Sequence, residues 1–416
     1  MRSATKPPDI NNMAVASAPQ PDARLDVLDG LRGIAILMVV WWHLWLFSWL
    51  TPYINLFGHQ SSILLIVPGT GLMGVELFFF LSGFVLFFPY ARHLFEGKPL
   101  QTVKHFAERR FLKIVPSYVI AFVAAALLIG QFTSPLNALW QTVAHLLFIH
   151  IFWIDTWVGV NGVLWSLGVE VQFYVLFPAL CWLFRRQPVP VYLLMCAIAV
   201  AYRMFAAHRD VANYALMGQL PAYLDLFADG MLASYVFVWL RNRPQHERYA
   251  WLATLIAAAA AAGLYALLAD LHAKLYITNG YAAWQAQNRQ FFGALVAVFT
   301  VAALFAYRWV HLAIANPLFR YLGVISYNLY LWHNVIMVYM LHRRIPAPTL
   351  PDPHADDHWK WVYTVWSLLI SLAISTLITY AIELPILKKG FRALIDPFWR
   401  RNAAPGPAPA ATVSDG

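Results

Sequence analysis

Apolar stretches long enough to cross a membrane recur along the whole chain, separated by short polar segments. A transmembrane helix needs about 20 mostly apolar residues. Stretches that approach or reach this length lie at 33–50, 71–90, 111–130, 163–184, 190–206, 220–240, 249–270, 291–309, 321–342 and 361–387. A further stretch at 139–155 is shorter and contains His145, His150 and Asp155. This pattern predicts an all-α fold, a polytopic bundle of about ten transmembrane helices.

The basic residues between these stretches predict how the chain is oriented, because short cytoplasmic loops are enriched in Lys and Arg. Basic residues occupy alternate loops: Arg92, Lys98, Lys104, Arg109, Arg110 and Lys113; Arg185 and Arg186; Arg241, Arg243 and Arg248; Arg308 and Arg320; Lys388, Lys389 and Arg392. The alternation holds only if 139–155 does not cross the membrane. We therefore expect this segment to be re-entrant or interfacial, and both termini to be cytoplasmic.

Composition excludes several other classes of protein. With 61% hydrophobic and 12% charged residues, the chain is too apolar for a soluble domain of its size. The net charge of +9 resides mainly in the loops, so it indicates topology rather than nucleic-acid binding. Cys181 and Cys196 both fall in apolar stretches, which predicts neither a disulfide framework nor a metal site.

The polar ends of the chain differ from its apolar middle. Residues 1–24 and 396–416 are rich in Pro and Ala, and we expect both to be disordered cytoplasmic tails. Residues 25–395 then form one membrane domain. The first apolar stretch begins far from Met1 and lacks a small-residue cleavage site, so we expect a retained span rather than a cleaved signal peptide.

The first apolar stretch contains the clearest candidate for chemistry. Arg32 precedes it and His43 lies within it, eleven residues later. Eleven residues are about three helical turns, so both side chains share one helix face, about 16 Å apart along the axis. Arg32 would lie at the membrane boundary and His43 near the middle. Ionisable residues at such depth are usually functional, although a membrane histidine can also serve only as a hydrogen-bond partner for a neighbouring helix.

Other polar residues extend this path across the membrane. His333 lies at mid-membrane, Glu76 and Glu170 lie in the outer half, and Ser82 lies deeper than Glu76. Ser166 and Tyr174 lie one turn from Glu170 on the same helix. Arg109, Arg110 and Lys113 form a cationic mouth at the cytoplasmic side, where Arg110 and Lys113 could clamp a phosphate from adjacent turns. Each of these residues also has a purely structural interpretation, as a topology signal or an interhelical partner.

Five sequence blocks in order, LDGLRGIAILMVVWWH, GVELFFFLSGF, RRFLKIVPSY, LWSLGVEVQFY and YLGVISYNLYLWH, resemble the bacterial acyltransferase-3 family. The family's pattern of Arg, ten residues and His matches Arg32 and His43. Its Arg-x-x-Arg motif falls on Arg110 and Lys113, where lysine keeps the charge but lacks the bidentate fork. A second departure is Val171, where the family commonly has another acidic residue.

The resemblance implies a multi-pass protein of the bacterial inner membrane that transfers an acyl group, most simply acetyl, from cytoplasmic acyl-CoA to a carbohydrate or lipid-linked sugar at the periplasmic side. The donor-binding residues would be Arg32, Arg109, Arg110 and Lys113. The catalytic residues would be His43, Glu170 and Glu76, supported by Ser82, Trp165, Ser166, Tyr174, Tyr330 and His333. His43 would act as a general base, although a covalent acyl-histidine is an open alternative. A proton-coupled transporter and a non-catalytic partner in polysaccharide export remain as other functions.

Overall fold

A computed structural model describes residues 25–51, 54–56, 59–61, 66–157, 159–209, 214–244 and 246–390 of the 416-residue chain. The two predicted disordered tails, 1–24 and 396–416, lie outside the described residues. Within the described part, helices dominate, and the predicted all-α bundle is confirmed. One short antiparallel hairpin accompanies them, formed by β1 (Ile54–Leu56) and β2 (His59–Ser61).

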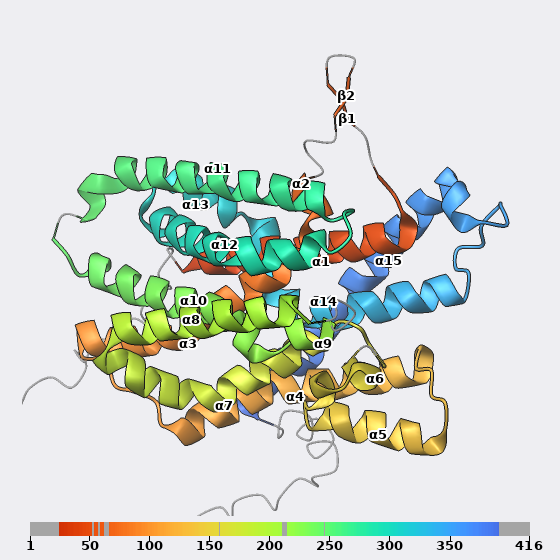
Figure 1. The fold of residues 1–416 in the computed structure, drawn as a ribbon, viewed down its shortest axis with the longest axis horizontal. Coiled ribbons are helices and arrows are strands. Elements are labelled where there is room, and N and C mark those ends of the chain that lie inside the picture. The colour runs from red at the N-terminus through yellow and green to blue at the C-terminus, as the bar shows by residue number, and fades with distance from the viewer. Residues whose placement is uncertain are drawn as a thin grey trace, which may run out of the picture.

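Long helices lying side by side form the body of the molecule (Figure 1). They are α1 (Asp26–Ser48), α3 (Gly74–Glu96), α4 (Val103–Leu128), α7 (Trp165–Arg186), α8 (Pro188–Ala207), α10 (Leu220–Arg241), α11 (Ala250–Lys274), α12 (Gly280–Phe305), α14 (Pro317–His342) and α15 (Asp357–Ile378). The shorter elements are α2 (Ile66–Gly69), η3 (Gly71–Met73), α5 (Pro135–Leu146), η4 (His150–Phe152), α6 (Ile154–Trp157), α9 (Tyr214–Met217), η5 (His246–Tyr249), α13 (Arg308–Ile314), η6 (Pro353–Ala355), the π-helical turn η7 (Thr379–Glu383) and α16 (Leu384–Lys389).

The chain is a multi-pass membrane protein. In the part of the chain that is described, nine helical segments are long and apolar enough to cross a membrane. Helix α14 has 26 residues and is also long enough, but it is more polar, with Asn328, His333 and Asn334 in its middle. Helix α5 has 12 residues and is about 18 Å long, so it cannot span a hydrocarbon core of about 30 Å. This agrees with the expectation that 139–155 does not cross.

Glycines let α1 and α14 pack with their backbones almost in contact. A Cβ atom at Gly33 would lie 1.9 Å from the carbonyl oxygen of Phe319, and one at Gly323 would lie 2.1 Å from that of Asp29. Both distances are shorter than any real contact allows, so only glycine fits at either position. The close approach fixes the register of α1 against α14, and with it the relative heights of the polar residues on the two helices.

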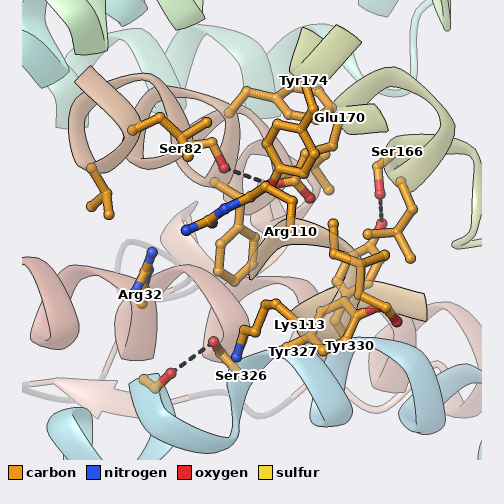
Figure 2. Close-up of a pocket in the computed structure, with 18 residues that line it drawn as sticks. Arg32, Ser82, Arg110, Lys113, Ser166, Glu170, Tyr174, Ser326, Tyr327 and Tyr330 are labelled. Carbon is orange, nitrogen blue, oxygen red and sulfur yellow. Dashed lines mark hydrogen bonds between the residues drawn. The ribbon is translucent and has the colours of Figure 1, made fainter. Parts of the chain in front are cut away.

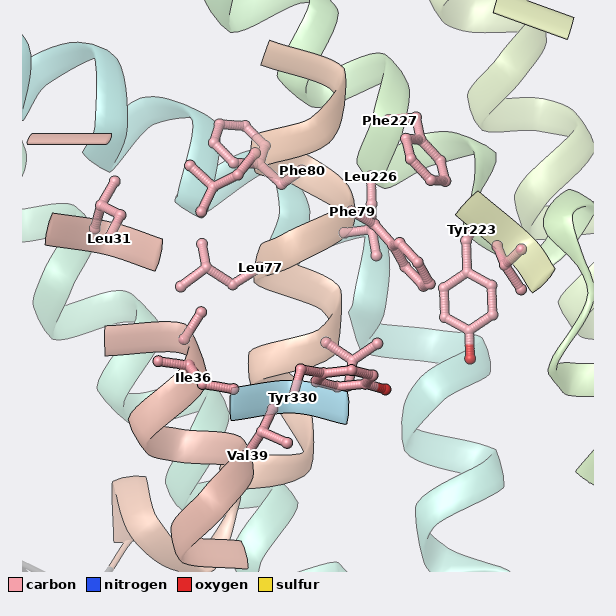
Figure 3. Close-up of a cluster of buried hydrophobic side chains, with 14 of the residues drawn as sticks. Leu31, Ile36, Val39, Leu77, Phe79, Phe80, Tyr223, Leu226, Phe227 and Tyr330 are labelled. Atoms are coloured by element: carbon pink, nitrogen blue, oxygen red, sulfur yellow. The ribbon is translucent and has the colours of Figure 1, made fainter. Parts of the chain in front are cut away.

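Aromatic side chains fill the space between α3 and α10. The Phe79 ring lies 5.1 Å from that of Phe227 and 4.9 Å from that of Tyr223, and Figure 3 shows it lying between α3 and these α10 residues. Phe173 of α7 stacks on the other side of Phe227 at 3.8 Å. Aromatic pairs of this kind contribute about 0.5–1.5 kcal/mol beyond the area they bury. They hold α10 against α3 and α7, two of the helices that form the wall of the site described next.

Candidate active site

Helices α1, α3, α4, α7 and α14 enclose a cavity, here called the central cavity, with a volume of about 120 Å³. Its walls include eight of the residues predicted from the sequence (Figure 2): Arg32, Ser82, Arg110, Lys113, Ser166, Glu170, Tyr174 and Tyr330. These residues are up to 298 positions apart along the chain. The predicted site residues on five helices therefore converge on one cavity.

Cationic side chains occupy one end of the central cavity. The Arg32 side chain is 34% exposed and lies 3.6 Å from Asp29, one turn earlier on α1. The Arg110 guanidinium lies over the Tyr174 ring, 5.9 Å from its centroid. Both guanidinium groups turn toward the same part of the cavity (Figure 2). Arg109 is exposed and is not part of the cavity wall.

Lys113 also reaches the central cavity, but its charge is already balanced. Its ammonium donates to Glu383, whose carboxylate is buried and also accepts a 2.6 Å hydrogen bond from Asn328. A paired lysine adds little net charge to the cavity, so Arg32 and Arg110 supply most of its positive potential. The sequence indicated Lys113 through the spacing of its motif, whereas Glu383 lies 270 residues away.

Glu170 lies in the wall of the central cavity and accepts two hydrogen bonds on one oxygen. Ser82 of α3 donates at 2.7 Å, and Tyr174, one turn away on α7, donates as well. Both donors come from residues that the sequence placed beside Glu170. The arrangement stabilises a carboxylate that links α3 to α7.

A hydroxyl pair closes the other end of the central cavity. Tyr330 of α14 donates to the carbonyl of Val163 at 2.8 Å, and its oxygen lies 2.6 Å from the Ser166 hydroxyl. The Ser166 hydroxyl also lies 3.3 Å from the Val163 carbonyl, so the two hydroxyls and this carbonyl form one hydrogen-bonded cluster. The Tyr330 ring also lies 5.9 Å from that of His333, one turn further along α14.

His43 and His333, here called the histidine pair, meet beyond Tyr330. Nδ1 of His333 lies 2.9 Å from the carbonyl of Leu329, and its Nε2 lies 3.3 Å from Nδ1 of His43. A carbonyl can only accept, so His333 carries its proton on Nδ1 and presents a lone pair at Nε2. Nδ1 of His43 lies 2.9 Å from the Val39 carbonyl and is therefore protonated, so its single N–H proton is shared between that carbonyl and the lone pair of His333.

This tautomer assignment leaves the lone pair of His43 on Nε2, where a general base needs it. His333 is fully buried, whereas His43 is only partly buried. The pair resembles a catalytic dyad in which a neutral imidazole, rather than a carboxylate, orients the base.

Five of the thirteen predicted site residues are not part of the central cavity wall: Arg109, the histidine pair, Glu76 and Trp165. Glu76 is 2% exposed and bonds to Gln285 of α12, and it is not part of the central cavity wall. Trp165 lines a different cavity, beside Tyr223 of α10. Ser326 was not among the predicted site residues, although it lines the central cavity. Its position within YLGVISYNLYLWH, one turn before Tyr330, was the available signal.

Comparison with known proteins bears on the family of the chain. A family model described as an acyltransferase domain matches residues 25–382. The chain belongs to the acyltransferase-3 family. Acyltransferase-3 relatives include the acyltransferase MdmB of Streptomyces mycarofaciens, which is 31% identical over 43% of this chain and 44% of its own length. The peptidoglycan O-acetyltransferase OatA of Listeria monocytogenes is 25% identical over 88% and 56%, and a putative O-acetyltransferase of Staphylococcus aureus is 22% identical over 91% and 59%.

The chain thus spans about half the length of these acyltransferase-3 relatives. No solved structure matches it. The family match covers every predicted site residue, from Arg32 to His333. The family assignment therefore applies to the whole site.

Proposed function

We propose that this protein is an integral-membrane O-acyltransferase that moves an acyl group, most simply acetyl, from acyl-CoA to a hydroxyl of a carbohydrate-type acceptor. One observation carries the proposal. A cavity that begins at two arginines, Arg32 and Arg110, ends at Tyr330, directly before a histidine pair with a basic nitrogen. Acyl transfer needs an anion site for the donor and a base for the acceptor. The central cavity holds the arginines, and its Tyr330 wall adjoins His333 of the histidine pair.

The donor suits the cationic end of this cavity. CoA carries phosphates, which arginine guanidinium groups bind through charge-assisted hydrogen bonds. The narrow cavity suits the long pantetheine arm rather than the nucleotide, so the nucleotide would remain at the entrance near Arg32. The arm would then extend along α14, past Ser326 and Tyr330, toward His43. Ser326 and Tyr330 lie on successive turns of one face of α14, and both line the cavity.

The chemistry follows from the lone pair on His43. Nε2 of His43 removes the proton from the acceptor hydroxyl as its oxygen attacks the thioester carbonyl carbon. A C–O bond forms, the C–S bond breaks, and the departing CoA thiolate takes up the proton from the His43 imidazolium. The hydrogen bond from His43 Nδ1 to His333 becomes charge-assisted while His43 is protonated. In the alternative route Nε2 attacks the thioester itself, and mass spectrometry of a trapped acyl-enzyme would distinguish the two.

The orientation of the protein follows from its loops. Basic residues cluster at the end of the bundle that holds Arg32 and Arg110, so we place this end at the cytoplasm, where acyl-CoA is found, in the inner membrane. The acceptor then reaches the histidine pair from the opposite side. The name of the Listeria relative, a peptidoglycan O-acetyltransferase, supports a carbohydrate-type acceptor.

Labelled acetyl-CoA tests the proposal. Membranes that contain the wild type, His43→Ala, Arg32→Ala or, as a matched control, Arg109→Ala are incubated with it, and label is counted in glycan and lipid fractions. We expect transfer by the wild type and Arg109→Ala, and its loss in the other two. Normal labelling by His43→Ala would remove the base assignment. Solute flux without acetyl-CoA turnover would instead indicate a transporter, and export that tolerates His43→Ala would indicate a non-catalytic partner.

A further inference from the structure

A second cavity, here called the aromatic chamber, lies beside the central cavity. Its walls include Trp157, Trp165, Tyr223, Tyr281, Gln285 and Arg289, and its volume is about 200 Å³. The two cavities share an aromatic partition. Phe79 lines the central cavity, and Figure 3 shows it beside Tyr223 of α10. Its ring lies 4.9 Å from that of Tyr223 and 6.3 Å from that of Trp165, and both of these residues line the chamber. Only the Phe79 side chain would thus separate a ligand in the chamber from an acyl donor in the central cavity.

Flat aromatic surfaces dominate one side of the chamber. Trp157 stacks on Trp165 with ring centroids 5.7 Å apart and an interplanar angle of 23°. The ring of Tyr223 of α10 lies 5.7 Å from that of Trp165 of α7. The electron-rich faces of such rings attract the polarised C–H groups of a sugar ring. An aliphatic lipid chain would gain no comparable specificity from them.

Polar groups occupy the deep end of the chamber. Gln285 donates to Glu76 at 3.1 Å and to Tyr281 at 2.8 Å, and Arg289 donates to the Gln285 oxygen at 2.5 Å. Within the described structure, Nε1 of Trp157 in the chamber wall is buried without a hydrogen-bond partner. An unmatched buried donor is costly unless a ligand or water completes it. A hydroxyl group can accept from this donor.

The chamber is accessible at its rim. Ile277 and Asn279, in the connection between α11 and α12, are exposed, whereas Gln285 and Arg289 behind them are buried. Other hollows differ in character. The groove between α10, α11 and α12 is lined by residues such as Leu232, and its walls are almost wholly aliphatic, as suits lipid chains.

We propose that the aromatic chamber binds a pyranose ring of the acceptor, which stacks on Trp157 and Trp165 while its hydroxyls bond to the polar groups around Gln285. This inference rests on the proposed acyl transfer and names the subsite that holds the acceptor. It gives Glu76, which accepts a hydrogen bond from Gln285, a role in positioning an acceptor-binding side chain instead of proton transfer. It also explains why Trp165 and Ser166, adjacent in sequence, line different cavities.

Photolabelling tests binding without requiring transfer. The purified full chain in nanodiscs is irradiated with a diazirine derivative of methyl glucopyranoside, and labelled peptides are identified by mass spectrometry. We expect label on peptides that include Trp157, Tyr223 or Ile277, and competition by excess methyl glucopyranoside. Label confined to other peptides, or label that resists competition, would overturn the proposal. Acetyl-CoA turnover is measured separately, so failure of the acyl-transfer proposal is distinguishable from failure of this one.

Kinetics with the same glucoside as acceptor provide a second test. Trp157→Leu should raise the acceptor KM at least about tenfold, the equivalent of one lost contact of about 1.4 kcal/mol, and leave the acetyl-CoA KM unchanged. Trp157→Phe keeps a flat ring and should restore most of the affinity. Trp153→Leu is the matched control, because Trp153 lies on the same segment but outside the chamber. Equal acceptor KM values for Trp157→Leu and Trp153→Leu would refute the assignment.

Discussion

Replacing His333 with leucine removes the lone pair that faces Nδ1 of His43, 3.3 Å away, and leaves the basic Nε2 of His43 in place. In the proposed reaction this hydrogen bond strengthens when His43 becomes charged. Hydrogen bonds to charged groups contribute about 1.5–3 kcal/mol, and each 1.36 kcal/mol corresponds to a tenfold rate. We therefore expect His333→Leu to lower kcat about 10- to 150-fold. His43→Ala removes the base itself and should cost about 10²–10⁴-fold.

The assay is acetyl transfer from labelled acetyl-CoA by membranes with matched amounts of each variant. His333 acts through His43, so its effect should appear in kcat while the acetyl-CoA KM stays constant. The double variant His43→Ala/His333→Leu should be no slower than His43→Ala alone, since the second change then has nothing to act on. His342→Leu makes the same substitution at an exposed position of the same helix and should retain wild-type activity.

Two results would contradict this reasoning. If His333→Leu slowed the wild type and His43→Ala by the same factor, His333 would act independently of His43. If His333→Leu mainly raised the acetyl-CoA KM, its role would lie in donor binding. His333→Gln, which retains an acceptor atom, should recover part of the lost kcat if the lone pair is what matters.

Three further predictions concern packing, donor binding and pH. Gly33→Ala would force α1 from α14 and should abolish transfer, whereas Gly162→Ala, whose Cβ meets nothing within 4 Å, should retain it in the same assay. Arg110→Ala should raise the acetyl-CoA KM about tenfold, and Arg109→Ala should leave it unchanged in steady-state kinetics. Burial lowers the pKa of His150 to about 3. Between this pKa and the ordinary histidine pKa of about 6.5, the unfolded chain binds a proton at His150 that the folded chain does not bind. Thermal stability should therefore fall as the pH drops from about 6.5 toward 3. His150→Phe should weaken that pH dependence in thermal unfolding curves.

The spacing of residues along single helices could be predicted from the sequence. Arg32 and His43 were expected on one face of the first helix, and the structure places Arg32 at the central cavity and His43 at the histidine pair. The contact between His43 and His333 could not be predicted. It joins residues 290 positions apart, and it depends on the register that Gly33 and Gly323 permit.

The aromatic chamber was missed for a related reason. The sequence placed a span at 291–309, whereas α12 begins at Gly280 and carries Gln285 and Arg289 inside the bundle. Because these residues are polar, the apolar stretch in the sequence begins only at 291 and omits the first part of the helix. Burial of these residues is tolerated because they bond to one another and to Glu76, contacts that exist only in the folded protein.

The hydrogen bonds of three acidic residues in the bundle explain why a histidine, and not a carboxylate, lies beside the proposed base. In the described structure Glu170 is bonded to Ser82 and Tyr174, Glu383 to Lys113, and Glu76 to Gln285, so each carboxylate is engaged away from His43. A carboxylate beside His43 would also carry a charge into a buried site, at a cost of several kcal/mol. Neutral His333 accepts at Nδ1 of His43 beside the Val39 carbonyl, without that cost. In the proposed reaction the pair starts uncharged, and charge separation arises only while the acceptor proton resides on His43.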